Sequence, residues 1–412
     1  MSQDPPRRRI PPPGFLAAGA PAAVLAALPG ARAVGGAVRD TLAGRPIQDV
    51  DVAVPLPPEA AAARLRAAGL KVFETGLAHG TLTAVLDGQP VEVTSLRRDV
   101  LTDGRHAEVA WSTDWREDAA RRDFTINAMS LSAAGELWDY FGGAEDLAAG
   151  KVRFVGDPAT RLAEDYLRAL RFFRFQARYG HGAPDAAAVA AIRAAVPGLA
   201  RLSAERVWME LKRLLAAPAP GAALALMAET GVLTSPHVLG EGIDLARLGR
   251  LLALGAPLRL MLRLAALAPT GKAGWAAALA TRLKFSAEER LALLRRAGDL
   301  PPPPPALEGK ALRRWLFRAA GEGRPDPTLA EDLAWLAEAT DGVERGALRA
   351  RLAATPVPVF PLQGRDALAL GMPPGAAMGR ALQAVRAWWL EGGCTADHAA
   401  CLEELRRHAG PA

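Results

Sequence analysis

Hydrophobic and polar positions in the first third of the chain alternate in short runs that are typical of β-strands. Residues 49–54, DVDVAV, place three valines on one face of a strand and two aspartates on the other. Two further alternating runs, Thr81–Leu86 and residues 90–95, flank Asp87-Gly88, which is a strong hairpin pattern. Glu92 faces away from the valines of the second run. Strand pairing would therefore bring Glu92 beside the two aspartates.

Helical patterns dominate the rest of the chain. Residues 37–43, 57–69 and 203–215 have the composition or period of helices, and Asp157-Pro158 opens a helix predicted to continue to residue 179. Residues 96–111 are polar and charged without a clean period, which predicts a mobile loop. The pattern predicts an α+β fold, in which a small mixed β-sheet with helices on one side precedes an all-α remainder.

Composition limits the class of protein. The 412 residues, half of them hydrophobic, allow two to four packed units, and the net charge of +6 fits a phosphate-rich partner as well as an ordinary soluble protein. Two cysteines, Cys394 and Cys401, are too few for a disulfide framework and favour the cytoplasm. The basic and apolar N-terminus imitates a secretory signal, but prolines interrupt it, so we predict a disordered leader and then a short helix.

The clearest candidate chemistry lies between residues 34 and 54. Gly35 and Gly36 precede a short helix and can form a phosphate cradle at its N-terminus, with Arg39 one turn on. Asp49 and Asp51 would repel each other on one strand face unless a divalent cation such as Mg²⁺ lay between them. A solvated strand edge is the alternative for an isolated D-x-D. The neighbouring glycines and arginine favour the metal site.

A second candidate group is the run RRDFTINAM at residues 121–129. Arg122 offers a planar fork for phosphate or ribose oxygens, and Asp123 and Asn127 can accept from or donate to sugar hydroxyls. In isolation, a salt-bridged helix start would explain the arginine and the aspartate equally well.

The helix predicted from Asp157 carries a stripe of charge, Asp165, Arg168, Arg171 and Arg174, at spacings of three. A carboxylate beside a guanidinium matches the donor and acceptor edges of cytosine and adenine, whereas uracil and guanine present the reverse polarity. Arg171 and Arg174 would then face phosphates. The alternative is a surface salt bridge, the usual meaning of D-x-x-R.

GG-x-V-R-D followed by D-x-D and RRDFTINAM resembles the polymerase-β-type nucleotidyltransferases, specifically the bacterial tRNA CCA-adding enzyme and poly(A) polymerase family, over residues 34–215. The resemblance implies that Asp49, Asp51 and Glu92 are catalytic, with the two aspartates holding two Mg²⁺ ions. Judged from the local sequence alone, Glu92 could equally be a solvent-facing residue of an amphipathic strand. The resemblance also implies that CTP and ATP are selected by Asp165 with Arg168.

The expected organisation is a leader and short helix (1–30), a catalytic head (31–148), a helical neck (149–217), a helical body (218–300) and a proline-rich linker with a helical tail (301–412). The expected function is template-independent addition or repair of the tRNA 3′-terminal CCA with release of pyrophosphate, the helical remainder gripping the acceptor stem. The alternatives are a poly(A) polymerase, an enzyme that adds only CC or only A, and an inactive RNA-binding protein. The expected loop disfavours the enzyme that adds only CC or only A.

Overall fold

The computed structural model describes residues 4–76, 80–102, 107–271, 274–298, 301–320 and 326–408. The chain divides into two compact units, Met1–Glu241 and Gly242–Ala412. The first unit contains a mixed β-sheet with helices around it, and the described residues of the second are helical outside their connecting segments. The predicted α+β fold is confirmed, whereas the finer domain boundaries stay predictions.

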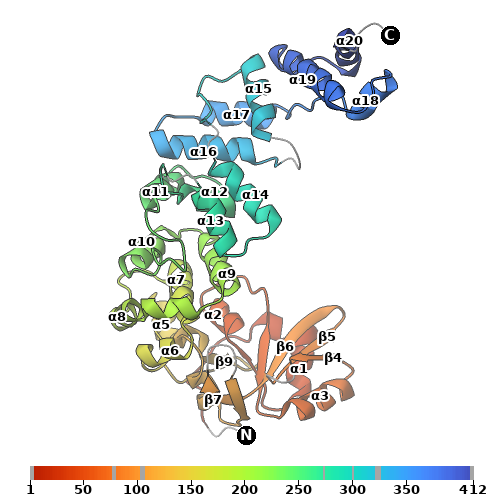
Figure 1. Ribbon diagram of the computed structural model, residues 1–412. Helices are drawn as coiled ribbons and strands as arrows, with labels where there is room; N and C mark the ends of the chain where they lie inside the picture. The colour runs from red at the N-terminus through yellow and green to blue at the C-terminus, as the bar shows by residue number, and fades with distance from the viewer. Residues whose placement is uncertain are drawn as a thin grey trace. The chain divides into compact units, whose positions relative to one another are not determined.

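Eight strands among the described residues form one sheet in the order β1-β10-β9-β2-β3-β6-β5-β4 (Figure 1). The strands are Arg8–Arg9 (β1), Arg32–Val34 (β2), Asp51–Val54 (β3), Lys71–Gly76 (β4), Thr81–Leu86 (β5), Gln89–Ser95 (β6), Met129–Leu131 (β9) and Glu136–Asp139 (β10). β3 and β6 are parallel, and the other neighbours are antiparallel. The predicted hairpin is confirmed, because β5 and β6 pair directly across Asp87-Gly88.

The parallel pairing of β3 with β6 sets Asp51 opposite Glu92. This register confirms the expectation for these two carboxylates. Asp49 lies before the strand rather than on it, so that part of the expectation was wrong. The reason is that the partner strand β2 ends at Val34, opposite Asp51, where Gly35 turns the chain with a φ of 65° into α2.

The two faces of the sheet are covered differently. Helices α1 (Gly19–Ala27), α2 (Gly36–Leu42), α3 (Pro58–Ala67) and α5 (Gly143–Ala148) pack on one face, where Val52 and Ala33 are buried (Figure 1). The opposite face carries Asp51, and beside it Val34 and Ala53 pack against Trp115 of α4 (Trp115–Ala120). Because α1, α2, α3 and α5 all lie on the first face, Asp51 on the second face is accessible to solvent.

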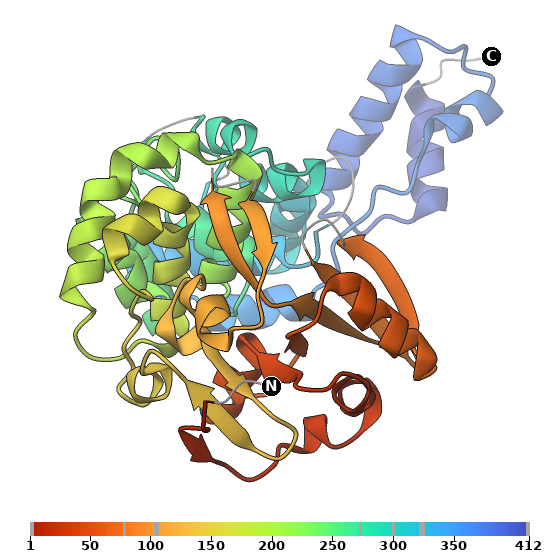
Figure 2. The same cartoon turned by 90° about the horizontal axis from the view of Figure 1, so that it is seen from below.

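Two predictions of irregular chain were wrong. Residues predicted as a mobile loop form a separate antiparallel ribbon of β7 (Arg97–Thr102) and β8 (Ala107–Trp111) (Figure 2), while residues 103–106 of that prediction lie outside the described residues. In the predicted disordered leader, β1 pairs with β10, whereas the short helix predicted to follow the leader is present as α1. Strands pair through backbone N–H and C=O groups, which all residues except proline carry in full. Strands held mainly by this pairing need no hydrophobic period in the sequence, so these strands were not predicted.

The helix predicted from Asp157 to residue 179 is interrupted. It consists of α6 (Pro158–Glu164) and α7 (Leu167–Tyr179), separated by Asp165, whose φ of −155° and ψ of 106° are extended. Asp157 caps α6 as predicted, accepting from the Thr160 backbone N–H at 2.8 Å. Asp165 accepts from the Leu167 backbone N–H at 3.0 Å in the same manner. A second aspartate therefore competes for the backbone and starts a new helix.

The remaining helices of the first unit are α8 (Ala186–Ala195), α9 (Ala204–Leu215) and α10 (Gly221–Glu229), with short 3₁₀ segments at Gly14–Leu16, Thr125–Asn127 and Val196–Arg201. The second unit contains α11 (Leu245–Ala253), α12 (Leu260–Ala266), α13 (Trp275–Arg282), α14 (Ala287–Arg296), α15 (Gly309–Ala320), α16 (Leu329–Asp341), α17 (Gly346–Ala354), α18 (Gly364–Ala369), α19 (Ala376–Glu391) and α20 (His398–His408). Among the described helices, none combines the length and apolarity that crossing a bilayer requires. Cys394 and Cys401 are free and buried in the cluster around Trp389.

A buried ion cluster stabilises the middle of the second unit. The Asp332 side chain is fully buried on α16 and contacts Arg259 at 2.6 Å and Arg296 at 2.7 Å. The Arg296 side chain is also buried and contacts Asp326 at 2.7 Å. Two elements far apart in sequence are thereby tied to α16.

We expect Asp332→Ala to lower the free energy of unfolding by about 3 to 5 kcal/mol, because it leaves buried guanidinium charge without its partner. Glu331→Ala is the matched control, since Glu331 contacts the same Arg259 from the next position but is one-third exposed. The control should cost less than about 1 kcal/mol. Urea unfolding of the full chain measures both, and equal losses would contradict the prediction.

Candidate active site

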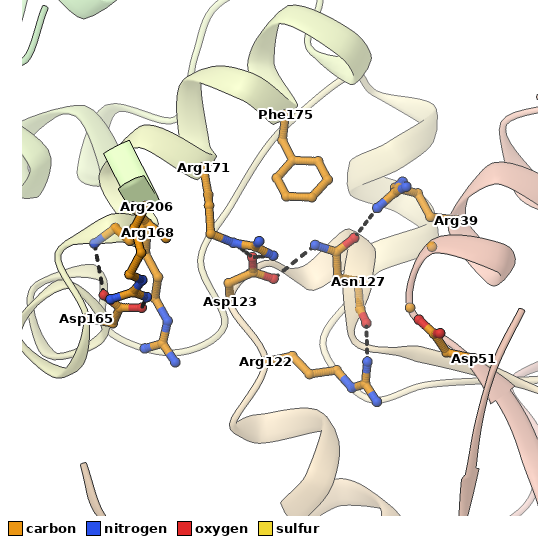
Figure 3. A pocket seen from close by; sticks show the side chains of 13 residues that line it. Arg39, Asp51, Arg122, Asp123, Asn127, Asp165, Arg168, Arg171, Phe175 and Arg206 are labelled. Carbon is orange, nitrogen blue, oxygen red and sulfur yellow. Dashed lines mark hydrogen bonds and ion pairs between the residues drawn. The ribbon is translucent and has the colours of Figure 1, made fainter. Parts of the chain in front are cut away.

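A cavity of about 410 Å³ opens between the N-terminal ends of α2 and α7 (Figure 3). Its lining residues are Gly35, Gly36, Arg39, Asp51, Arg122, Asp123, Asn127, Asp165, Leu167, Arg168, Arg171, Phe175 and Arg206. The cavity thus gathers the predicted nucleotide-binding residues from three separate stretches, with the exception of Arg174. Its size suits a small molecule such as a nucleotide.

One wall of the cavity is acidic. Asp51 lines it, Glu92 is the direct neighbour of Asp51 on β6, and Asp49 lies two residues earlier; all three residues are exposed to solvent. Partial loss of water around Asp51 raises its pKa, Arg122 opposes this, and Asp49 adds to it. The same desolvation, and then Asp51, raise the pKa of Glu92. This set of repelling oxygen donors is one that a divalent cation would stabilise.

Gly35 allows this wall to approach the basic part of the cavity. Its φ of 65° is one that residues with a Cβ adopt rarely. A Cβ there would lie 3.4 Å from Nη1 of Arg122 and 4.0 Å from Oδ2 of Asp51. The predicted glycine pair is therefore placed where a backbone must come close to both an arginine and a carboxylate.

A chain of buried polar contacts forms the floor (Figure 3). Arg39 Nη1 donates to Asn127 Oδ1 at 2.5 Å, and Asn127 Nδ2 donates to Asp123 Oδ1 at 2.9 Å. Asp123 Oδ2 accepts from Arg171 Nε at 2.7 Å. Burial alone would raise the pKa of Asp123, but Arg171, Asn127 and the Phe124 backbone N–H hold it below its ordinary value. Asp123 is thus an ionised acceptor whose two oxygens are both engaged.

The third part of the cavity surrounds Asp165. Its Oδ2 accepts from Arg206 Nη2 at 2.6 Å, while its Oδ1 caps α7. Arg168, three residues on, lines the same cavity and pairs with Glu164 through its Nη1. The predicted Asp165 and Arg168 are thus neighbours in the cavity, although Asp165 precedes the helix instead of lying within it.

Sequence analysis missed several residues that shape the cavity. Arg206 of α9 and Phe175 of α7 both line its wall. Arg174 turns from the cavity to Glu210, with Nε 2.6 Å from Oε2. Glu210 is 3% exposed on the packed face of α9 beside Leu211 and Leu214. A carboxylate at a core position of an amphipathic helix needs a basic partner, and this pattern could have indicated Glu210.

Comparison with known proteins supports this arrangement. The family model described as "Poly A polymerase head domain" matches residues 31–153, and the one described as "Probable RNA and SrmB- binding site of polymerase A" matches residues 184–238. A crystal structure of the Bacillus stearothermophilus CCA-adding enzyme in complex with CTP superposes with a TM-score of 0.71 at 29% identity, covering 92% of each chain.

Two relatives that share one name extend the match along the chain. The chain is 47% identical over 214 residues to the mitochondrial CCA tRNA nucleotidyltransferase 1 of Danio rerio, a match that spans about half of each protein. It is 37% identical over 373 residues to that of Mus musculus, which covers 88% of this chain and 83% of the mouse protein. Similarity at this level over most of both proteins shows that the chain belongs to the CCA tRNA nucleotidyltransferase family of enzymes.

Proposed function

We propose that this enzyme adds or repairs the 3′-terminal CCA of tRNA, using CTP and ATP and releasing pyrophosphate. The observation that carries the proposal is the single cavity in which Asp51 lies beside Gly35 at one end and Asp165 lies beside Arg168 at the other. The pocket would thereby receive the triphosphate beside Asp51 and Gly35, and the base beside Asp165 and Arg168. The similar structure of the Bacillus stearothermophilus CCA-adding enzyme in complex with CTP supports this proposal.

Nucleotidyltransferases of this kind generally use a divalent metal ion, and we propose two Mg²⁺ ions held by Asp49 and Asp51, with Glu92 as the third catalytic carboxylate. The acidic wall fits hard cations, because its donors are carboxylate oxygens whose mutual repulsion a cation relieves. Ions bound there would lower the pKa of the primer 3′-hydroxyl and neutralise charge on the leaving pyrophosphate. Among the described residues, no three or more His, Cys, Asp or Glu side chains form a ready-made metal cluster, so triphosphate and water oxygens would complete the coordination.

The neighbouring residues would hold the nucleotide. Gly35 and Gly36 bring backbone N–H groups at the start of α2 toward the triphosphate, and Arg122 lies above Gly35. Asn127 and Asp123 would meet the sugar. Arg39 and Arg171 are bound to these two residues and would fix their orientation while facing the cavity. A phosphate contact by Arg174 stays a prediction. In the structure, the Arg174 guanidinium is paired with Glu210.

Base selection would rest on Asp165 and Arg168. Cytosine and adenine each present an amino donor beside a ring acceptor, so both can satisfy a carboxylate and a guanidinium together. Uracil and guanine would direct a carbonyl at Asp165 and an N–H at Arg168. Arg206 holds Asp165 in a fixed position for this discrimination.

The partner would be tRNA, bound through its acceptor stem and 3′ end. A-form RNA is recognised mainly through its backbone and shape, which suits a chain with 50 lysine and arginine residues. We propose the cytoplasm as the compartment, on the basis of two cysteines that stay free and buried. The relatives from Danio rerio and Mus musculus are mitochondrial proteins, so the mitochondrion is the alternative compartment.

The purified protein should extend a tRNA transcript that lacks CCA, in the presence of Mg²⁺, CTP and ATP, by those three residues and no further. Sequencing of the 3′ ends after incubation with each nucleotide alone and with the mixture tests this. Long A tails from ATP alone would indicate a poly(A) polymerase, and addition of CC or A only would indicate a partial enzyme. No extension in any mixture would contradict the enzymatic proposal.

Asp51→Asn should lower the rate of nucleotide addition by about a thousandfold or more, because metal-assisted charge stabilisation is worth several kcal/mol. Asp87→Asn, in the hairpin turn between β5 and β6, is the control and should leave the rate unchanged. Gel-shift titration with tRNA should give similar affinities for both variants. A full rate in Asp51→Asn would exclude Asp51 as a metal ligand.

Asp165→Ala should reduce the preference for CTP over UTP by about tenfold or more, because the mismatched carbonyl no longer meets a carboxylate, a penalty of about 1 to 3 kcal/mol. Single-nucleotide addition with each pyrimidine triphosphate measures the ratio. Asp157→Ala removes the exposed cap of the preceding helix and serves as the control. An unchanged ratio in Asp165→Ala would place base selection elsewhere.

A further inference from the structure

Asp118 on α4 is a buried carboxylate that the sequence did not single out. Its side chain is 3% exposed. Oδ1 accepts from Arg121 Nε at 2.9 Å and Nη2 at 2.7 Å, and Oδ2 accepts from Arg122 Nη2 at 3.1 Å. Burial by itself would raise the pKa of Asp118, but the two arginines hold it below the ordinary value. One ionised group therefore anchors both arginines that precede Asp123.

The helix that carries Asp118 is itself fixed to the sheet. Asp114 caps its first turn, accepting from the Arg116 backbone N–H at 2.7 Å. Trp115 is 3% exposed and packs with Val34 and Ala53 on the face that carries Asp51. The guanidinium of Arg32 is 4.2 Å from the Trp115 ring centroid and 3.5 Å from that of Trp138. Asp118, one turn after Trp115, is thus held in place by the sheet.

The contact to Asp118 leaves the other end of the Arg122 guanidinium directed at the cavity. Nη2 is bound to Asp118, whereas Nη1 lies above Gly35 and 3.5 Å from the Asn127 carbonyl oxygen. Arg122 also interacts electrostatically with Asp51, the central residue of the acidic wall. Without Asp118, the guanidinium would be free to move toward Asp51 and compete with a cation there.

We infer that Asp118 is a positioning residue that aims Arg122 at the incoming nucleotide and keeps it from pairing with Asp51. The inference rests on the proposed function, since it assigns a support to one of its nucleotide-binding residues. It also explains why a carboxylate is buried next to a pocket that must accept a polyanion. The charge of Asp118 is compensated by two arginines, and the group faces away from the cavity lining.

A double-mutant cycle tests the inference. Asp118→Asn should raise the KM for CTP by about tenfold, the loss expected for one charge-assisted hydrogen bond, with a smaller change in kcat and none in the KM for tRNA. Arg122→Gln should raise the KM for CTP at least as much. The variant with both changes should match Arg122→Gln alone, because Asp118 acts through Arg122. Additive losses in kcat/KM for CTP would overturn the inference.

Asp114→Ala is the matched control on the same helix, because alanine cannot accept from the Arg116 backbone N–H. It weakens the cap and should lower the thermal midpoint without changing the KM for CTP. If Asp118→Asn does not fold, Arg121→Gln with Asp118→Asn removes one positive and one negative charge together, and it is compared with Arg121→Gln alone. The cycle can also be measured as CTP binding in Mg²⁺ by calorimetry without tRNA, so a failure of tRNA extension would not be mistaken for a failure of this inference.

Discussion

The ion pair between Asp123 and Arg171 joins two of the stretches of chain from which the cavity is built. Asp123 follows the sheet-bound helix α4, and Arg171 lies in the middle of α7, 48 residues later. Asp123 is buried whereas the Arg171 side chain is 30% exposed, and Asn127 and the Phe124 backbone N–H supply the further hydrogen bonds that the buried carboxylate requires. If this pair were broken, neither the wall that we propose faces the sugar nor the wall that we propose faces the base would keep its place relative to Asp51.

The same principle recurs around the site. Arg39, Arg122, Arg171 and Arg174 carry like charges that repel one another, but each contacts a carboxylate or an amide of the protein. Aromatic rings assist, since the Phe175 ring lies within 6 Å of three of these guanidinium groups. The arginines are thus preorganised before a triphosphate arrives, which lowers the entropic cost of binding it. The acidic wall, in contrast, has charges that repel, and we propose that bound cations stabilise it.

The arrangement also explains why the chain must interrupt a helix at Asp165. A continuous helix would satisfy the backbone of Leu167 within itself and would carry Asp165 as one more solvated charge. In the structure, one oxygen of Asp165 starts α7 and the other binds Arg206 from α9. The residue that we propose selects the base is therefore fixed by two different elements, and its direction depends on their packing. Precision of this kind is what discrimination between similar bases demands.

The sequence determined several strands, most helices and the identity of most cavity residues, because these follow from local patterns. Alternation gave β3, β5 and β6, a glycine pair marked the start of α2, and the charge spacing around Arg168 marked the third wall. Tertiary structure alone decided what those residues contact. The ribbon of β7 and β8 arises from main-chain pairing that has no side-chain pattern, and Asp49 lies outside β3 because its partner strand ends early. Arg206, Glu210 and Asp118 acquire their roles from partners on other elements, since a buried charge is stable only where the fold brings its counter-charge.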